Sequence, residues 1–337
     1  MERTTGATIV TLTMNPALDI STNADVVRPT DKIRCGGARY DAGGGGINVA
    51  KIAHVLGESV SAVYPAGGPT GQALTDLLVH DGVPICPIEI AASTRESFTI
   101  NEIGTGLQYR FVLPGPSLSF VEQQQCLAQL RRAATSARFV VASGSLPPGA
   151  PVNFYQQVGL ICRDRGVPLV LDTSGGGLKH ITSGVHLLKA SVRELRECVG
   201  RDLVTESEQL DAAREIIDCG RAQVVVVSLG PDGALLATAQ ESLRCPAIPM
   251  RALSGVGAGD AMVAAITVGL SRDWSLSKSL RYGVAAGAAM LMTPGTQPCT
   301  RADAERLFEV AEQPVEIEGV SRGGIEEAVV GGGQRHR

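Results

Sequence analysis

Short apolar runs rich in Val, Ile and Leu alternate with helical patterns along most of this chain. The first run, Ala7–Thr13, is typical of a buried strand, and Gly46–Leu56 carries apolar residues on more than one face of a helix. Further predicted strands are Ser59–Pro65, Ile85–Ile90, Phe139–Ala142, Pro168–Leu171, Gly184–Leu188 and Val224–Leu229. Further predicted helices are Thr70–His80, Glu122–Ala134, Val152–Arg165 and Ser207–Cys219. This alternation predicts an α/β fold with a mostly parallel sheet covered on both faces.

Two stretches, Asp19–Tyr40 and Arg95–Leu113, interrupt that pattern. Both are extended and polar at alternate positions, and neither has a helical stripe. We expect each to supply two strands of a small separate sheet that covers the functional site, with ordinary surface excursions as the alternative. The last segment, 314–337, is rich in glycine and charge without periodicity, which predicts a folded domain over 1–313 and a disordered tail.

Composition narrows the possible partners. The 337 residues include 40 glycines, which suit tight strand-to-helix turns, and carry a formal net charge of −4. Nucleic acid is therefore not an expected partner, because phosphate-backbone binding needs a basic surface. The eight cysteines form no close pair, there is no signal-peptide profile, and no apolar run is long enough to span a membrane. These features predict a cytoplasmic protein without a membrane partner.

A glycine-dense turn, Gly257-Ala258-Gly259-Asp260, leads into the apolar segment Ala261–Leu270. Unpaired backbone N–H groups and the helix dipole make such a helix start an anion site. Asp260 falls on the first helical turn, where it could accept a proton from an attacking hydroxyl. The alternative is that Asp260 only caps the helix.

Four further segments carry candidate chemistry. Four successive glycines before Ile47 and Asn48 open a helix and allow a ligand close to the main chain. Loops beginning at Ser143 and Asp172 follow predicted parallel strands, at the sheet edge where α/β proteins bind ligands. A third strand leads into the glycine turn Ser228–Gly233. The chain has no Gly-Lys dipeptide and no G-x-G-x-x-G at its late turn, which excludes a Walker A loop and disfavours a dinucleotide site.

Taken in order, the Gly43–Ala50 run, the Ser143–Gly149 loop and the Gly257–Asp260 turn resemble the PfkB, or ribokinase-like, carbohydrate kinases. The resemblance covers about Ala7 to Val310. The opening Thr11–Asp19 is similar to the phosphofructokinase and tagatose-6-phosphate kinase branch, and the segments starting at Lys32 and Tyr109 are most similar to its 6-phosphofructokinases. The resemblance implies a three-layer α/β/α domain with a small β-sheet lid, and a homodimer formed through the lid.

The resemblance also implies the reaction. It would be ATP- and Mg²⁺-dependent phosphorylation of the C1 hydroxyl of fructose 6-phosphate. Asp260 would be the base, and the backbone of Gly257, Ala258 and Gly259 the anion hole. Substrate contacts would come from Asp19, Lys32, Gly44, Gly45, Asn48, Arg95 and Ser143. Residues around ATP would be Lys189, Glu194, Ser228, Gly230 and Gly233, with Mg²⁺ held mainly by ATP phosphates and Glu194 reaching it through water.

The chain departs from the family pattern at two places. It has Ser191 where relatives often have Asn, and Ser254-Gly255 where many have Asp-Thr, so a monovalent-cation site is not expected. Alternatives remain open: a kinase of tagatose 6-phosphate or fructose 1-phosphate, or a non-catalytic sugar-phosphate sensor. Lys32, Arg34, Arg95 and Arg110, which fall on the predicted lid, favour a phosphorylated acceptor, and a sensor would not need Asp260.

Overall fold

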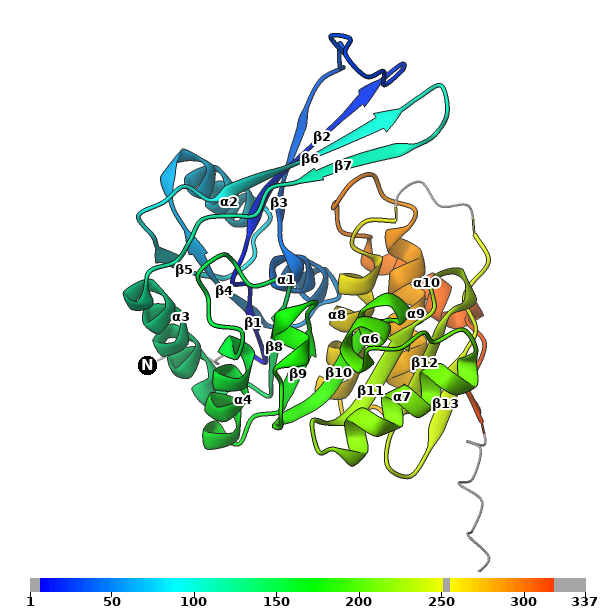
Figure 1. Cartoon of the computed structure of the whole chain (residues 1–337). Coiled ribbons are helices and arrows are strands. Elements are labelled where there is room, and N and C mark those ends of the chain that lie inside the picture. Colours follow the sequence, from blue (N-terminus) through cyan, green and yellow to red (C-terminus); the bar gives the residue numbers. More distant parts are fainter. Residues whose placement is uncertain (1–6, 251–254, 318–337) are drawn as a thin grey trace, which may run out of the picture.

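The computed structural model describes residues 7–250 and 255–317, which form one α/β domain and a projecting lid (Figure 1). The central sheet has ten strands in the order β14-β13-β12-β11-β10-β9-β8-β1-β4-β5. Its parallel part is β1 (Ile9–Leu12), β4 (Val60–Ala66), β5 (Ile85–Glu89), β8 (Phe139–Ser143), β9 (Leu169–Asp172), β10 (Val185–Ser191) and β11 (Ala222–Ser228). Three antiparallel strands extend it: β12 (Ala234–Ala237), β13 (Ser242–Cys245) and β14 (Val315–Glu316). The predicted mostly parallel sheet is confirmed.

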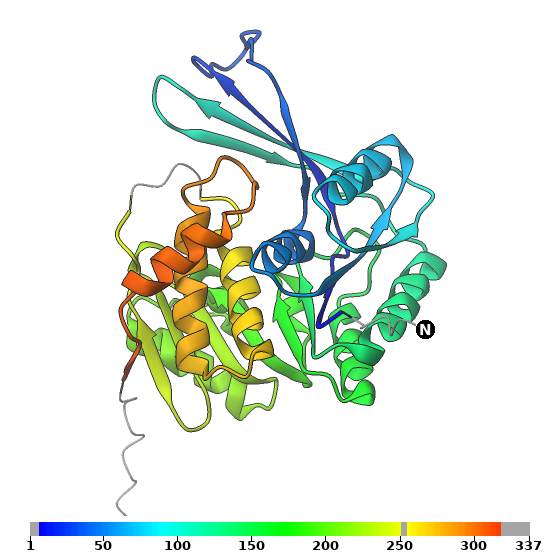
Figure 2. The same cartoon turned by 180° about the vertical axis from the view of Figure 1, so that it is seen from behind.

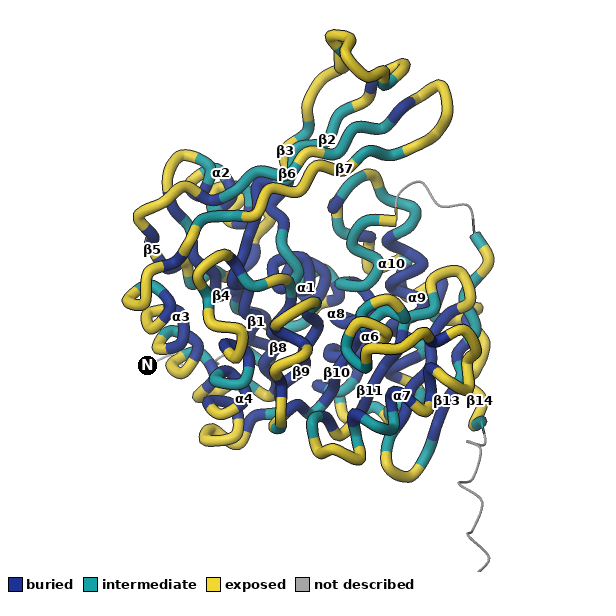
Figure 3. The backbone as a smooth tube through the Cα atoms, in the orientation of Figure 1, coloured by how far each residue is buried: buried dark blue, intermediate teal, exposed yellow. Residues whose placement is uncertain are grey.

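Helices cover both faces of this sheet. One face carries α3 (Phe120–Ala133), α4 (Phe154–Arg165), the short α5 (Gly176–Lys179), α6 (Val192–Val199) and α7 (Glu206–Asp218). The other, turned to the viewer in Figure 2, carries α1 (Gly45–Val55), α2 (Gly68–His80), α8 (Ala258–Ser271), α9 (Leu276–Met290) and α10 (Arg301–Val310). The buried strands between these layers stand out in Figure 3. The arrangement is the expected three-layer α/β/α domain.

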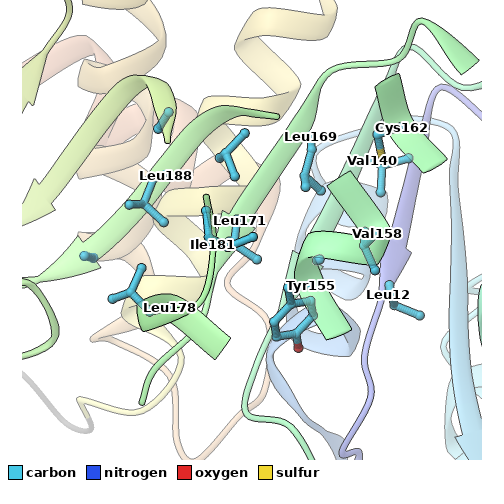
Figure 4. Packing of buried hydrophobic residues seen from close by; sticks show 14 of the residues in the cluster. Leu12, Val140, Tyr155, Val158, Cys162, Leu169, Leu171, Leu178, Ile181 and Leu188 are labelled. Atoms are coloured by element: carbon cyan, nitrogen blue, oxygen red, sulfur yellow. The ribbon is translucent and has the colours of Figure 1, made fainter. Parts of the chain in front are cut away.

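Alternating side chains of each strand feed two separate cores. On β1, Ile9 packs toward the α8 and α9 layer, whereas Val10 and Leu12 pack toward α3 and α4. Figure 4 shows Val158 and Tyr155 of α4 beside the β1, β8 and β9 side chains. Because both faces are buried, each strand reads as a continuous apolar run.

No helix in the described part of the chain is both long enough and apolar enough to cross a bilayer.

The lid is a four-stranded sheet in the order β3-β2-β6-β7. Its strands are β2 (Ala17–Ala24), β3 (Arg39–Gly43), β6 (Arg95–Glu102) and β7 (Gln108–Val112). Each interrupting segment thus contributes two strands, as predicted. The main domain extends past residue 313, because β14 pairs with β13. The rest of the expected tail, from 318, lies outside the described residues.

Candidate active site

Asp260 lies on the first turn of α8, at the floor of a cavity of about 340 Å³ between the lid and the carboxyl ends of the parallel strands. Its Oδ2 accepts a hydrogen bond of 2.9 Å from Nδ2 of Asn48, which comes from α1. Burial raises the pKa of Asp260 to about 7, and the nearby Asp172 adds to this, while the Asn48 hydrogen bond and Lys189 oppose it. Near neutral pH, a carboxyl group with this pKa is ionised in a substantial fraction of the protein molecules.

α8 begins at a glycine. Gly257, at the N-cap position, adopts φ +80° and has no side chain to cap the helix. Among the described residues the Asp260 side chain bonds to Asn48 rather than to a backbone amide, which disfavours the capping interpretation of Asp260. Gly257 and Gly259 line the cavity, and a Cβ on Gly259 would stand 2.9 Å from Lys189 Nζ. A helix N-terminus with unpaired amides and an ammonium beside it is suited to a phosphoryl group.

The glycine run meets the loop after β8 at the same cavity. A Cβ on Gly45 would lie 2.3 Å from Ser143 Oγ, so these two segments can be adjacent only because residue 45 is glycine. The side-chain Oδ1 of Asn48 is buried without a partner among the described residues. An orphaned acceptor that faces a polar cavity is suited to a ligand hydroxyl.

The inner face of the lid forms the roof. Asp41 of β3, Asp19 of β2 and Ser97 of β6 stand side by side in the strand register, and all three line the cavity. Burial raises the pKa of Asp19 to about 6, opposed chiefly by Arg95 and then Arg110. Asp41 was not predicted from the sequence, because nothing local distinguishes it from any other residue before a glycine run.

The two lid arginines that line the cavity differ in their contacts. Arg95 donates to three backbone carbonyls at the base of the lid, those of Leu113 (2.8 Å), Asn15 (3.0 Å) and Pro16 (3.4 Å). A guanidinium has five N–H donors, so two remain for a ligand. Arg110 makes no such contacts to the lid base and lines the cavity. The sequence indicated both arginines as candidates, but not that Arg95 is bound to the base of the lid and Arg110 is not.

On the far wall, Lys189 of β10 lies 3.3 Å from Asp172 of β9, its register partner on the neighbouring parallel strand. Burial would lower the pKa of Lys189, but Asp172, Glu194 and Asp260 together raise it. Glu194 also lines the cavity, although its Oε2 accepts from the backbone N and Oγ of Ser191 in a capping box. Ser191 thus starts α6.

The remaining predicted residues lie elsewhere. Ser228 is the register partner of Ser191 at the end of β11, and Gly230 and Gly233 follow it; none of the three lines the cavity. Lys32 is exposed in the loop between β2 and β3, also away from the cavity of its own chain. Of Ser254-Gly255, where many relatives have Asp-Thr, Gly255 lines the cavity and Ser254 lies outside the described residues.

The charges of the lining do not balance. Five carboxylates face three cations, a net charge of −2 when all are ionised; the carboxylates are Asp19, Asp41, Asp172, Glu194 and Asp260, and the cations are Arg95, Arg110 and Lys189. Within the described residues no cluster of three or more His, Cys, Asp or Glu side chains could hold a metal by itself. An anionic ligand that brings its own cation would therefore suit this lining.

Asp260 is a buried carboxyl group with a pKa of about 7, at a helix start that has no N-cap side chain, under a lid. These features define a phosphoryl-transfer site of the carbohydrate kinase type. The model of the pfkB family of carbohydrate kinases matches residues 12–303. The chain belongs to this family.

Individual relatives agree with the family match. "ATP-dependent 6-phosphofructokinase isozyme 2" of Mycobacterium tuberculosis (strain H37Rv) is 69% identical over 309 residues, covering 92% of this chain and 91% of the relative. Its counterpart in Escherichia coli K12 is 37% identical over 302 residues, 89% of this chain and 97% of the relative. A crystal structure of phosphofructokinase-2 from Escherichia coli in complex with fructose-6-phosphate has a TM-score of 0.85 at 36% identity, covering 90% of this chain and 99% of that one.

Proposed function

We propose that this chain is an ATP-dependent 6-phosphofructokinase, which transfers the γ-phosphoryl group of ATP to the C1 hydroxyl of fructose 6-phosphate. The products are fructose 1,6-bisphosphate and ADP. The observation that carries the proposal is Asp260, buried beside the uncapped start of α8 with a pKa of about 7. The two curated relatives named above are ATP-dependent 6-phosphofructokinases.

In the proposed reaction Asp260 takes the proton of the C1 hydroxyl as its oxygen bonds to the γ-phosphorus. The bond from that phosphorus to the β,γ-bridging oxygen breaks, and its electron pair leaves with ADP. The amides of Gly257, Ala258 and Gly259 hold the charge on the transferred group. Asn48 fixes the Asp260 carboxylate through their hydrogen bond.

The sugar phosphate binds between the glycine run and the lid. Asp19, the Ser143 hydroxyl and Oδ1 of Asn48 take the sugar hydroxyls, and the main chain at Gly44 and Gly45 allows close approach. Arg110 binds the 6-phosphate with its free guanidinium, and Arg95 contributes its charge and its two remaining donors.

ATP lies along the opposite wall, past Lys189 and Glu194 and toward the turn formed by Ser228, Gly230 and Gly233. The residues present suit Mg²⁺ only as part of its ATP complex, since the described residues hold no self-sufficient metal cluster. Glu194 would be the residue that helps to hold Mg²⁺ with ATP, and the ion would supply positive charge to the phosphates. The ammonium of Lys189 lies beside Gly259, so Lys189 holds the γ-phosphate of ATP against the anion hole.

We further propose a homodimer formed through the outer faces of the lids. On that face Tyr40, Ile20, Phe98 and Phe111 form one row across all four strands. Tyr40 and Phe111 are each 52% exposed. An exposed apolar row of this kind favours a partner surface, and a second copy of the lid is self-complementary to it. The pairing would also bring Lys32 to the neighbouring cavity, where the lining has more carboxylates than cations.

The function is tested by coupled measurement of ADP release with fructose 6-phosphate, tagatose 6-phosphate, fructose 1-phosphate and ribose. We expect the highest kcat/KM with fructose 6-phosphate. Asp260→Asn should lower kcat by a factor of about 10²–10⁴, whereas the control Asp202→Asn, at an exposed aspartate, should leave it unchanged. Preference for another sugar would overturn the substrate assignment. A wild-type rate in Asp260→Asn would overturn the role of Asp260, and binding of a sugar phosphate without turnover would favour the sensor.

A further inference from the structure

Lys51 is a buried cation that the reaction described above does not use. It lies on α1 three residues after Asn48, is 3% exposed, and does not line the cavity. Its Nζ donates to two main-chain carbonyls, those of Ala42 (3.2 Å) and Thr296 (3.4 Å). It forms no ion pair with any carboxylate in the part of the chain that the structure describes.

Burying an ammonium without a contacting carboxylate is unfavourable. Burial lowers the pKa of Lys51, and only the more distant Asp41, Asp81 and Asp19 oppose this. An apolar side chain at this helix position would avoid the cost of removing the charge from water. Stability of the core alone therefore does not account for a lysine here.

The two carbonyls belong to segments that meet at one side of the cavity. Ala42 directly precedes the glycine run, and a Cβ on Gly43 would collide with the Asp19 carboxylate. Thr296 follows α9 and lines the cavity. Its neighbour Gly295 packs against the lid, since a Cβ there would stand 3.5 Å from Ser21 Oγ and 3.6 Å from Asp41 Oδ2.

A second, more exposed link joins the same two segments. Arg39 of β3 forms an ion pair of 2.7 Å with Asp41, and its Nη1 donates to Gln297 Oε1 at 2.7 Å. Arg39 belongs to lid strand β3, whereas Lys51 lies on a buried helix of the main domain. Lys51 is thus placed to hold both segments in one position relative to Asn48 and, through it, Asp260.

We propose that Lys51 is a positioning residue, which clamps the 293–297 loop to the base of lid strand β3 and so fixes the acceptor side of the cavity relative to Asp260. It contacts neither substrate. Its effect on catalysis rests on the proposed function, but the clamp itself is a property of the fold.

Kinetics of Lys51→Met test the catalytic consequence. Met has a similar length and no charge, so the core stays filled while both hydrogen bonds are lost. We expect kcat/KM for fructose 6-phosphate to fall by about 10- to 100-fold, with KM for ATP within about twofold of wild type. ATP hydrolysis without sugar should rise relative to transfer, because the cavity is less well closed. Lys51→Arg, whose guanidinium can still donate to both carbonyls, should recover most of the activity.

Amide hydrogen exchange of the 293–297 segment tests the clamp independently of activity. Exchange should accelerate in Lys51→Met and remain at the wild-type rate in Lys51→Arg and in Lys278→Met, which removes an exposed lysine from the ring face of Trp274. Unchanged exchange together with unchanged kcat/KM in Lys51→Met would overturn the proposal. If Lys51→Met does not fold, Lys51→Gln takes its place, because its shorter amide cannot reach both carbonyls. Wild-type exchange and unaltered kinetics in Lys51→Gln would then overturn the proposal. Failure of the wild type to phosphorylate any sugar would contradict the proposed function and leave the exchange result to decide on the clamp.

Discussion

Asn48 and Asp260 are 212 residues apart in the chain, and their side chains are joined by a hydrogen bond of 2.9 Å. The bond links the first helix after the glycine run to the first turn of α8. It fixes the carboxylate of Asp260, the proposed base, relative to α1. The Oδ1 atom of Asn48 is buried and has no hydrogen-bond partner among the described residues.

The pH dependence of kcat/KM should show an acid limb with an apparent pKa near 7. Asp260 must be ionised to accept a proton, and its pKa is raised to about 7 by burial and by Asp172. Asn48→Ala removes a hydrogen bond to the ionised form, so its acid limb should move to higher pH. The comparison needs kcat/KM for fructose 6-phosphate from pH 5 to 9, with Asp202→Asn as control. A limb that stays in place in Asn48→Ala would contradict the assignment.

Asp260→Asn should be more stable than the wild type above neutral pH. The folded-state pKa of Asp260 lies above its ordinary value of 3.8, so the stability contributed by its protonated form is present below about 4 and is lost as pH rises through about 7. The variant carries no charge to bury. Its advantage in unfolding free energy should therefore grow between those pH values, toward an upper limit on the order of 4 kcal/mol.

Urea unfolding followed by the fluorescence of Trp274, the single tryptophan, measures this difference at pH 5 and pH 8. Trp274 packs against Tyr282 and Phe308, just past the C-terminal end of α8, whereas Asp260 lies on the first turn of that helix. Asp202→Asn should show no comparable change between the two pH values. An advantage of Asp260→Asn that is larger at pH 5 than at pH 8 would be inconsistent with a raised pKa.

Local sequence patterns predicted the parallel strands, the lid and the Gly257–Asp260 turn, because each is encoded in adjacent residues. They did not predict α9, which is rich in Ala and Gly and buried on most sides, so that it lacks an amphipathic stripe. Gly283 of α9 fits against Ile266 of α8, where a Cβ would lie 2.6 Å away. This close approach depends on packing between helices and leaves no periodic signal.

The site could be predicted only in part, for the same reason. Residue types at loop ends indicated Asp260 and Asn48, and the family resemblance indicated Lys189, but pairings such as Lys189 with Asp172 follow from strand register. The carbonyl contacts of Arg95 likewise depend on how the lid base folds back. Sequence identifies which groups are available, whereas the sheet order determines which of them meet.

Arg110→Lys and Arg95→Lys should have different effects on two acceptors. Arg110→Lys loses the planar pair of donors to the 6-phosphate, so kcat/KM should fall about 10- to 100-fold for fructose 6-phosphate and little for unphosphorylated fructose. Arg95→Lys cannot hold three carbonyls at once, so the lid base loosens and both acceptors should be affected by similar factors. The ratio of the two kcat/KM values separates these cases. A loss confined to fructose 6-phosphate in Arg95→Lys would show that phosphate contact is its main role.

Mixing Lys32→Ala with Asp260→Asn chains should restore activity if Lys32 serves the neighbouring cavity. In such a heterodimer one site combines Asp260 of the first chain with Lys32 of the second, and the other site lacks both. Random pairing should therefore recover up to about a quarter of the wild-type rate. Unfolding and refolding the chains together, followed by ADP-release assays, provides the measurement.

The matched control for that mixture is the double variant Lys32→Ala, Asp260→Asn mixed with wild type. Its heterodimers contain no complete site if Lys32 acts across the lid interface, so activity per wild-type chain should fall. Phe111→Asp, which places a charge in the exposed apolar row, should yield monomers in sedimentation velocity and a loss similar to that of Lys32→Ala. If the Lys32→Ala and Asp260→Asn mixture is no more active than the average of its components, Lys32 does not act across the interface. Its exposed position outside the cavity of its own chain would then exclude it from the phosphate site altogether.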